Sequence, residues 1–117
     1  MKFVALIYRP QGALDDISRE EMNELHLGHE KLQDASRGDG IFVLFNRLHH
    51  PDLAAIISQN EGQYQVTDGP FTKIQEVLWG YYLFECDNLE HAIRYAKRIP
   101  MTEGSKIEVR PVASYMD

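Results

Sequence analysis

Cysteine is almost absent from this sequence, and positive charge is scarce and scattered. Cys86 is the only cysteine in 117 residues, so no internal disulfide can form. Such cysteine usage agrees with a reducing compartment, and we expect a cytoplasmic protein. Twelve Lys and Arg residues face eighteen Asp and Glu residues, which gives a net charge of −6. No basic cluster interrupts this acidic balance, so a phosphate backbone would be repelled, and we expect no direct nucleic-acid partner.

Long hydrophobic runs are also missing. The N-terminal stretch MKFVALIYRP ends at Arg9 and Pro10, before it reaches the length of a signal peptide. No segment approaches the roughly 20 apolar residues of a membrane span, so we expect no membrane partner. Repeats, linkers and low-complexity segments do not occur. A chain of this length fits a single domain, 1–117, which can bury about two-thirds of its unfolded surface.

Hydrophobic periodicity divides the chain into strands and helices. Ser18 followed by Glu21 is a capping box, and apolar residues then recur at three- and four-residue steps, which predicts an amphipathic helix. Asp87 or Asn88 is placed to cap a second helix. The pattern predicts strands at 2–8, 41–48, 77–86 and 106–112, helices at 18–38 and 88–99, and a hairpin at 53–67.

This order of elements predicts an α+β fold of the ferredoxin-like class. Two β-α-β units with an inserted hairpin between them match the split βαβ plan. In that plan an antiparallel sheet carries both helices on one face. The hairpin would lie outside the repeated units.

Both faces of the predicted sheet are apolar. FVALIY (3–8) and IFVLF (41–45) are hydrophobic at every position, whereas a sheet face open to water is polar at every second residue. An uncovered apolar face of this size is unusual for a monomer. We therefore expect a homodimer whose two sheets pack together through this face. The alternative is that the inserted hairpin folds over part of it.

The second half of the chain carries a family resemblance. VTDGPFTKIQEVLWGYYLFECDNLEHAIRYAKRIP (66–100) followed by IEVRPV (107–112) resembles the DGPF-type branch of the YCII-related family, and the likeness extends from MKFVALIY to Val112. The resemblance implies a dimeric α/β-barrel of ferredoxin-like protomers. It also implies a histidine and an aspartate as an active-site pair. The family includes a dehydrochlorinase-like member and domains attached to transcriptional sigma factors.

His29 is the candidate residue for proton transfer. It interrupts the apolar stripe of the first helix between Leu25 and Leu32, where an unpaired polar ring costs about 1 to 3 kcal/mol. The family resemblance offers Asp68 as its hydrogen-bond partner. A histidine held by an aspartate is suited to general base catalysis near neutral pH. The alternative is that His29 is a satisfied core residue and that Asp68 only stabilises the Asp-Gly-Pro-Phe turn.

Phe71, Trp79, Tyr81 and Arg110 are candidate ligand-binding residues. The aromatic side chains can line an apolar cavity between protomers, although aromatic strands are also typical of plain core. Arg110 shares one face of the last strand with Glu108. If the other face meets the helices, Arg110 points toward the dimer side. It can then bind a ligand carboxylate or pair with an acid across the interface.

No metal or cofactor motif is present. His26, His29 and Glu30 lie near one another on the first helix, but no further ligand has convincing spacing. His49 and His50 point in opposite directions on an extended segment. GxGxxG, P-loop and zinc-finger spacings are all missing, so we expect neither a metal nor a cofactor.

Two functions remain open from the sequence. One is a cofactor-free isomerase, lyase or dehydrochlorinase-like enzyme for a small cyclic or aromatic metabolite, with His29 moving a proton and Asp68 orienting it. The other is a ligand- or protein-binding regulatory module, linked by resemblance to transcription, in which no bond changes. A purely structural role is disfavoured because the chain has no repeats or tails to build with. An open cavity holding both residues would favour the enzyme.

Overall fold

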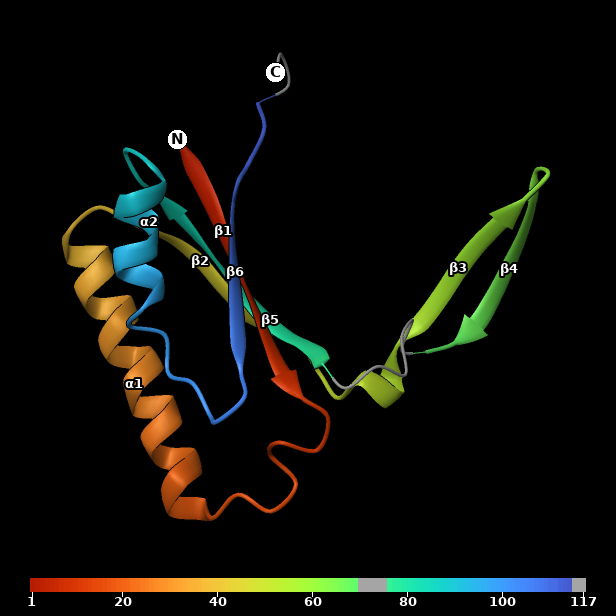
Figure 1. The fold of residues 1–117 in the computed structure, drawn as a ribbon, viewed down its shortest axis with the longest axis horizontal. Helices are drawn as coiled ribbons and strands as arrows, with labels where there is room; N and C mark the ends of the chain where they lie inside the picture. The colour runs from red at the N-terminus through yellow and green to blue at the C-terminus, as the bar shows by residue number, and fades with distance from the viewer. Residues whose placement is uncertain (70–75, 115–117) are drawn as a thin grey trace.

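The computed structural model describes residues 1–69 and 76–114. Figure 1 shows the chain as two helices, a central sheet and a separate hairpin. The elements in chain order are β1 (Lys2–Pro10), α1 (Arg19–Gly38), β2 (Phe42–Arg47), a short 3-10 helix (Pro51–Leu53), β3 (Ala55–Asn60), β4 (Gln63–Asp68), β5 (Glu76–Glu85), α2 (Leu89–Ala96) and β6 (Lys106–Pro111).

Side-chain caps start both helices where the sequence predicts them. Ser18 Oγ accepts a hydrogen bond from the backbone N–H of Glu21 at 3.1 Å. Asn88 Oδ1 accepts one from the N–H of His91 at 2.9 Å. Each cap satisfies a backbone donor that has no partner within its own helix. α2 ends at Ala96, three residues earlier than predicted, and the chain continues through turns to Pro100.

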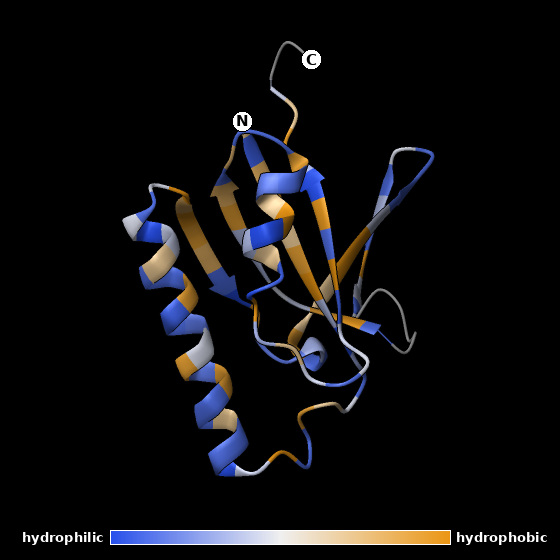
Figure 2. Cartoon of the chain, turned by 60° about the vertical axis from the view of Figure 1, so that its left-hand side comes forward, coloured by the Kyte–Doolittle hydropathy of each residue, from blue (hydrophilic) through white to orange (hydrophobic). Residues whose placement is uncertain are grey.

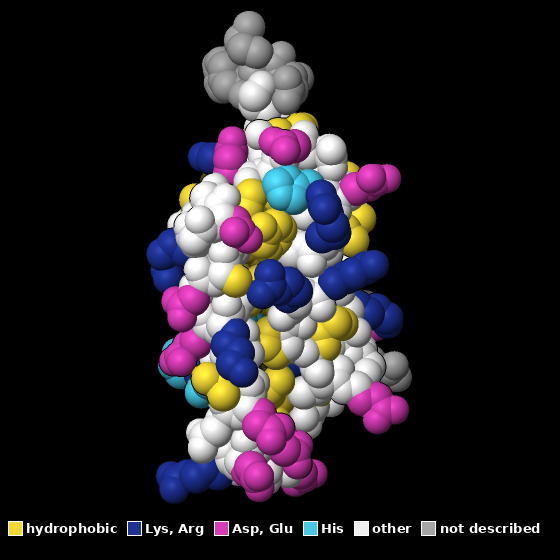
Figure 3. Space-filling model, turned by 90° about the vertical axis from the view of Figure 1, so that its left-hand side faces the viewer, with side chains coloured by type: hydrophobic (Ala, Val, Ile, Leu, Met, Phe, Trp, Pro, Cys, Tyr) yellow, Lys and Arg dark blue, Asp and Glu magenta, His cyan; other side chains and the backbone are white. Residues whose placement is uncertain are grey.

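The four-stranded sheet has the order β2-β5-β1-β6, and every neighbouring pair is antiparallel. This order fits the split βαβ plan, so the predicted α+β class with two helices and antiparallel sheets is confirmed. Both helices cover the same face of the sheet (Figures 1 and 2). That face carries Lys, Arg, Asp and Glu side chains interspersed on its outer surface, with acidic ones gathered at one end (Figure 3).

The core lies between the sheet and the helices. Its largest fully buried side chains include Tyr82, Phe84 and Ile7 from the strands and Leu32 from α1. On β1 these buried positions alternate with half-buried ones, Val4, Leu6 and Tyr8, which lie on the opposite face. β1 and β2 are hydrophobic along most of their length (Figure 2), as the two-sided sequence pattern predicts.

The β3–β4 hairpin forms its own two-stranded sheet and projects away from the helices (Figure 1). Every residue of its two strands is exposed except Ile56, which is half-buried. The Cα radius of gyration is 16.3 Å, compared with about 13 Å for a compact domain of this length. Within the described chain the hairpin therefore does not fold over the open sheet face, and that alternative is wrong.

A β-bulge in β5 positions the side chain of Trp79. Ile7 pairs with Gly80 and Tyr8 pairs with Leu78, so Trp79 is the extra residue between them. Gly80 is required here because a Cβ at this position would lie 2.7 Å from the carbonyl oxygen of Asn46. Bulges often redirect a side chain next to a functional site.

No helix of the described segments is long and apolar enough to cross a membrane.

Candidate functional site

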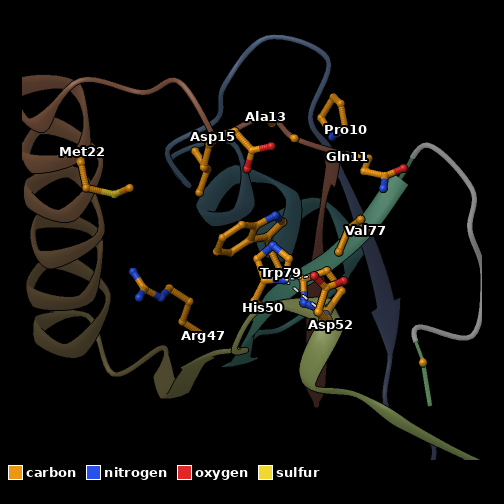
Figure 4. Close-up of a pocket in the computed structure, with 14 residues that line it drawn as sticks. Pro10, Gln11, Ala13, Asp15, Met22, Arg47, His50, Asp52, Val77 and Trp79 are labelled. Atoms are coloured by element: carbon orange, nitrogen blue, oxygen red, sulfur yellow. Dashed lines mark hydrogen bonds and ion pairs between the residues drawn. The ribbon is translucent and has the colours of Figure 1, made fainter. Parts of the chain in front are cut away.

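A hollow of about 800 Å³ lies at the end of the sheet where β1 ends and β5 begins. The loop after β1 forms one wall and Met22 of α1 forms another, while Asp52 of the 3-10 helix and its N-cap residue His50 also line the hollow. Trp79 and Arg47 lie between these walls (Figure 4). We call this hollow the outer cavity.

A smaller inner cavity of about 30 Å³ continues from the outer one toward the core. Its lining includes Arg9, His26, His29 and Phe45. The two cavities share four lining residues, namely Leu14, Met22, Arg47 and Trp79. The pair therefore forms one continuous site that narrows toward His29.

His29 is held on α1 by a hydrogen bond and by ring stacking. Its Nδ1 lies 2.7 Å from the hydroxyl oxygen of Tyr82. Its ring stacks on Phe45, with centroids 5.0 Å apart, and on Tyr82 at 5.8 Å. Tyr82 is fully buried, so its position on β5 is fixed by the core. The imidazole therefore has one anchored nitrogen, while Nε2 makes no hydrogen bond to a described residue.

The surroundings of His29 keep its ring neutral. Burial, followed by the electrostatic influence of Arg9, His26 and Arg47, lowers the pKa of His29 to about 4. No acid contributes to this shift. Since a charge at this site is opposed both by desolvation and by nearby cations, the imidazole is uncharged at neutral pH.

Tyr82, the hydrogen-bond partner of His29, also has a shifted pKa. Burial raises the pKa of Tyr82 to about 12, and a side-chain hydrogen bond from Gln33 acts in the opposite direction. When the hydroxyl of Tyr82 donates to Nδ1 of His29, the imidazole hydrogen lies on Nε2. When Nδ1 donates to that hydroxyl, Nε2 is the acceptor.

Arg9 is a buried cation without an acidic partner in the described chain. Its side chain follows Phe3, Ala5 and Ile7 on the helix-covered face of β1, and it is only 5% exposed. Nη1 donates to Thr102 Oγ1 at 3.3 Å, and the guanidinium carbon lies 5.8 Å from the centre of the Trp79 ring. Nε is buried and has no hydrogen-bond partner. Burial lowers the pKa of Arg9, which reflects the cost of its desolvation.

Arg47 brings a second positive charge to the boundary between the two cavities. Its Nη1 donates to Nε2 of His26 at 3.2 Å. The acids of the site lie in the outer cavity, where Asp52 pairs with His50 at 3.5 Å and Asp15 lines the rim. Positive charge therefore dominates the inner cavity.

Metal binding has no support in the described residues. Across 1–69 and 76–114, no three His, Cys, Asp or Glu side chains come together in a way that could hold a metal ion. Burial raises the pKa of the Cys86 thiol, which keeps it protonated and unreactive at neutral pH.

Comparison with known proteins assigns the chain to a family. A family model for the YCII-related domain matches residues 1–115. The chain belongs to the YCII-related family. It is also 30% identical over 121 aligned residues to an uncharacterised protein of Rhizobium meliloti (strain 1021), and the alignment covers 98% of this chain and 94% of that protein.

In this YCII-related protein, the two residues proposed as a catalytic pair are not joined. His29 lines the inner cavity and bonds to Tyr82. Asp68 is exposed at the end of β4, and its side chain makes no hydrogen bond or ion pair to a described residue. Only its neighbour Gly69 lines the outer cavity. Within one chain, Tyr82 rather than Asp68 therefore orients His29.

The candidate ligand-binding residues fall at different places. Trp79 lies on the wall shared by the two cavities. Tyr81 lines neither cavity, and its hydroxyl accepts a hydrogen bond from Asn46 at 3.0 Å. Arg110 is exposed on β6, on the face opposite Val109, which packs toward α2. Phe71 lies outside the described residues.

Sequence reasoning missed Arg9 and Arg47 as site residues, and it gave Tyr82 no role beside His29. The signal for Arg9 was present, since it continues the buried alternation of β1 at the position after Ile7. Tyr82 carried a weaker signal, because an aromatic residue in a hydrophobic strand looks like ordinary core. Arg47 had no local signal, since only the pairing of β2 with β5 places it beside Gly80.

Proposed function

We propose that this YCII-related protein, of the DGPF-type branch, binds a small cyclic or aromatic metabolite and transfers a proton on it without a cofactor. The reaction class is an isomerisation or elimination, as in a lyase or a dehydrochlorinase-like enzyme. One observation carries the proposal. A neutral His29, anchored through Nδ1 to Tyr82, lines a cavity whose shared wall is the aromatic ring of Trp79.

The proposed chemistry uses the neutral tautomer in which Tyr82 donates to Nδ1 and the imidazole hydrogen lies on Nε2. When a proton leaves the carbon next to a carbonyl group, negative charge develops on the carbonyl oxygen. An Nε2–H of His29 can donate a hydrogen bond to that oxygen and stabilise the enolate. The carbon-bound proton passes to water in the open outer cavity. Tyr82 has the orienting role that the family resemblance gives to Asp68.

A second candidate is a binding module that changes no bond. A pKa of about 4 favours it, because a base that weak removes protons poorly at neutral pH. In this case the cavity only binds a metabolite, and the regulatory effect depends on whether the cavity is occupied. The two candidates share the binding step and differ in the fate of the ligand's proton.

Hydrogen exchange on enolisable ligands separates the two candidates. We expect the protein to accelerate deuterium uptake from D₂O at the benzylic carbon of phenylpyruvate, measured by NMR. His29→Leu removes the donor and should slow the catalysed exchange by roughly 10²-fold. His49→Leu is the matched control, because His49 is exposed and makes no hydrogen bond to a described residue. Binding without exchange supports the module instead, and exchange that survives His29→Leu contradicts the proposed enzyme.

We also propose that the protein is a homodimer through the open sheet face. Val4, Leu6 and Tyr8 line the centre of that face and are only half-buried in one chain. The hairpin adds apolar side chains, since Ile57, Tyr64 and Val66 are 67 to 74% exposed. A lone two-stranded hairpin is at best marginally stable in water, so contact with a second copy would stabilise it.

Substitution on the open face tests the dimer. Leu6→Asp places a charge at the centre of this face and should convert dimer to monomer in light scattering or analytical ultracentrifugation. Leu27→Asp is the control, because Leu27 is 50% exposed on α1, on the other side of the sheet. A wild-type mass of one chain, or a dimer that resists Leu6→Asp and is lost with Leu27→Asp, contradicts this interface.

A further inference from the structure

The inner cavity contains a buried positive charge that the fold does not neutralise. Arg9 is 5% exposed, its Nε has no hydrogen-bond partner, and the side chain makes no hydrogen bond or ion pair with an acid within 1–69 and 76–114. A buried charge is normally paired, because removing it from water is costly. A negatively charged ligand in the cavity would supply the partner that Arg9 lacks.

The free edge of the guanidinium is the one that binds carboxylates. Nη1 is the guanidinium nitrogen that bonds to a described residue, Thr102. Thr102 is itself held by Ser105, with their oxygens 2.8 Å apart. This leaves Nε and Nη2, whose parallel N–H groups match the two oxygens of a carboxylate.

The charges around the inner cavity also favour an anion. Arg47 brings a second guanidinium group to the same lining, where His26 accepts a hydrogen bond from it and His29 is neutral. The acids of the site, Asp15 and Asp52, line the outer cavity and not the inner one. A ligand would therefore enter with its negative group first.

The volumes of the two cavities match two parts of one ligand. The inner cavity, at about 30 Å³, holds roughly two water-sized groups, as many as the oxygens of a carboxylate. The outer cavity, at about 800 Å³, has room for a ring. Trp79 lines both, so a ring held there would stack on its indole while the acid group points inward.

We propose that the inner cavity is an anion subsite in which Arg9 and Arg47 bind the carboxylate of a small aromatic or cyclic acid whose ring lies against Trp79. The subsite deepens the proposed function and rests on it for the use of this cavity. It specifies that the metabolite is an acid, which the proposed function alone does not require.

The binding step has an electrostatic consequence for His29. The charged and titratable groups that face its ring are Arg9 of β1, His26 of α1, Arg47 of β2 and Tyr82 of β5. A carboxylate between the two arginines opposes the charges that disfavour the imidazolium. Acid binding is thus expected to raise the pKa of His29 and to be accompanied by partial proton uptake at mildly acidic pH.

Fluorescence of the single tryptophan tests the subsite directly. Trp79 is the only tryptophan in the chain, so its emission reports ligand in the cavity. We would titrate wild-type protein with phenylacetate and with phenylacetamide, which have the same ring and differ in charge. The acid should bind roughly 10- to 100-fold more tightly than the amide. Arg9→Met should remove that preference, and Arg47→Met should weaken it.

The control is Arg94→Met, since Arg94 is exposed on α2 and lines neither cavity. Circular dichroism establishes that each variant is folded. Arg9→Lys keeps the positive charge but loses the pair of parallel N–H groups, so it should retain only part of the preference for the acid over the amide. Equal binding of acid and amide overturns the anion subsite but leaves the proposed small-molecule cavity intact. Failure of both ligands to change Trp79 emission at millimolar concentration overturns both. Acid binding that Arg9→Met leaves unchanged overturns the role of Arg9.

Discussion

Replacing Arg9 by Met is expected to raise the free energy of unfolding by about 1 to 2 kcal/mol, an unusual result for a substitution in a buried position. The reason is the unpaired charge. Arg9 is 5% exposed, its Nε has no partner, and burial lowers its pKa. Met has similar length and no charge to desolvate. Thr102 keeps its hydrogen bond to Ser105, so the substitution leaves no polar group newly unpaired there.

The measurement is urea unfolding of the wild type and Arg9→Met at pH 7, monitored by circular dichroism. Arg94→Met, on the exposed face of α2, should change stability by less than about 0.5 kcal/mol. A loss of more than about 1 kcal/mol in Arg9→Met would mean that Arg9 is needed for the fold. In that case its burial would need no ligand to explain it.

Lowering the pH from 6.5 to 4 is expected to reduce stability by roughly 2 to 3 kcal/mol through His29 alone. Above pH 6.5 the ring is neutral in both the folded and the unfolded chain, so it contributes nothing. Below that value His29 is protonated in the unfolded chain but stays neutral in the folded chain, because its pKa in the folded chain is about 4. Below pH 4 both states are protonated and the loss levels off.

The slope of stability against pH is the quantity to compare. His29→Gln should remove the contribution of His29 to the slope between pH 6.5 and 4. Its overall stability should also fall, because the hydrogen bond to Tyr82 changes. His49→Gln should keep the wild-type slope, since His49 is exposed. A slope that is the same in wild type and His29→Gln would contradict a neutral, desolvated His29.

Local sequence signals were sufficient for most of the fold. Ser18 and Asn88 mark helix starts through hydrogen bonds to residues three positions away, so the information is contained in a short window. The two-sided hydrophobic pattern of β1 likewise predicts a strand with no water-facing side. The position of the hairpin was not predictable, because its residues contact little besides each other and its alternation does not say where it points.

The site was harder to predict because its contacts join residues far apart in the chain. His29 and Tyr82 are separated by 53 positions, and Arg9 and Thr102 by 93. The bulge that brings Trp79 to the cavity depends on the close approach of Gly80 to the backbone of Asn46, which no local pattern reveals. The apolar periodicity of the first helix predicts that His29 lies on the face toward the core. Its partner, Tyr82, could not be predicted in this way, because the pairing of the strands determines which residue of β5 lies beside His29.

The most direct test of a cationic cavity built around a neutral His29 is ¹⁵N NMR of its imidazole ring between pH 3.5 and 8, without ligand and with phenylacetate. We predict that the free protein has the Nε2–H tautomer at pH 7 and a pKa near 4, and that phenylacetate raises this pKa while phenylacetamide does not. A His29 that is already half-protonated at pH 6.5 in the free protein, or a pKa unchanged by bound acid, would contradict the account.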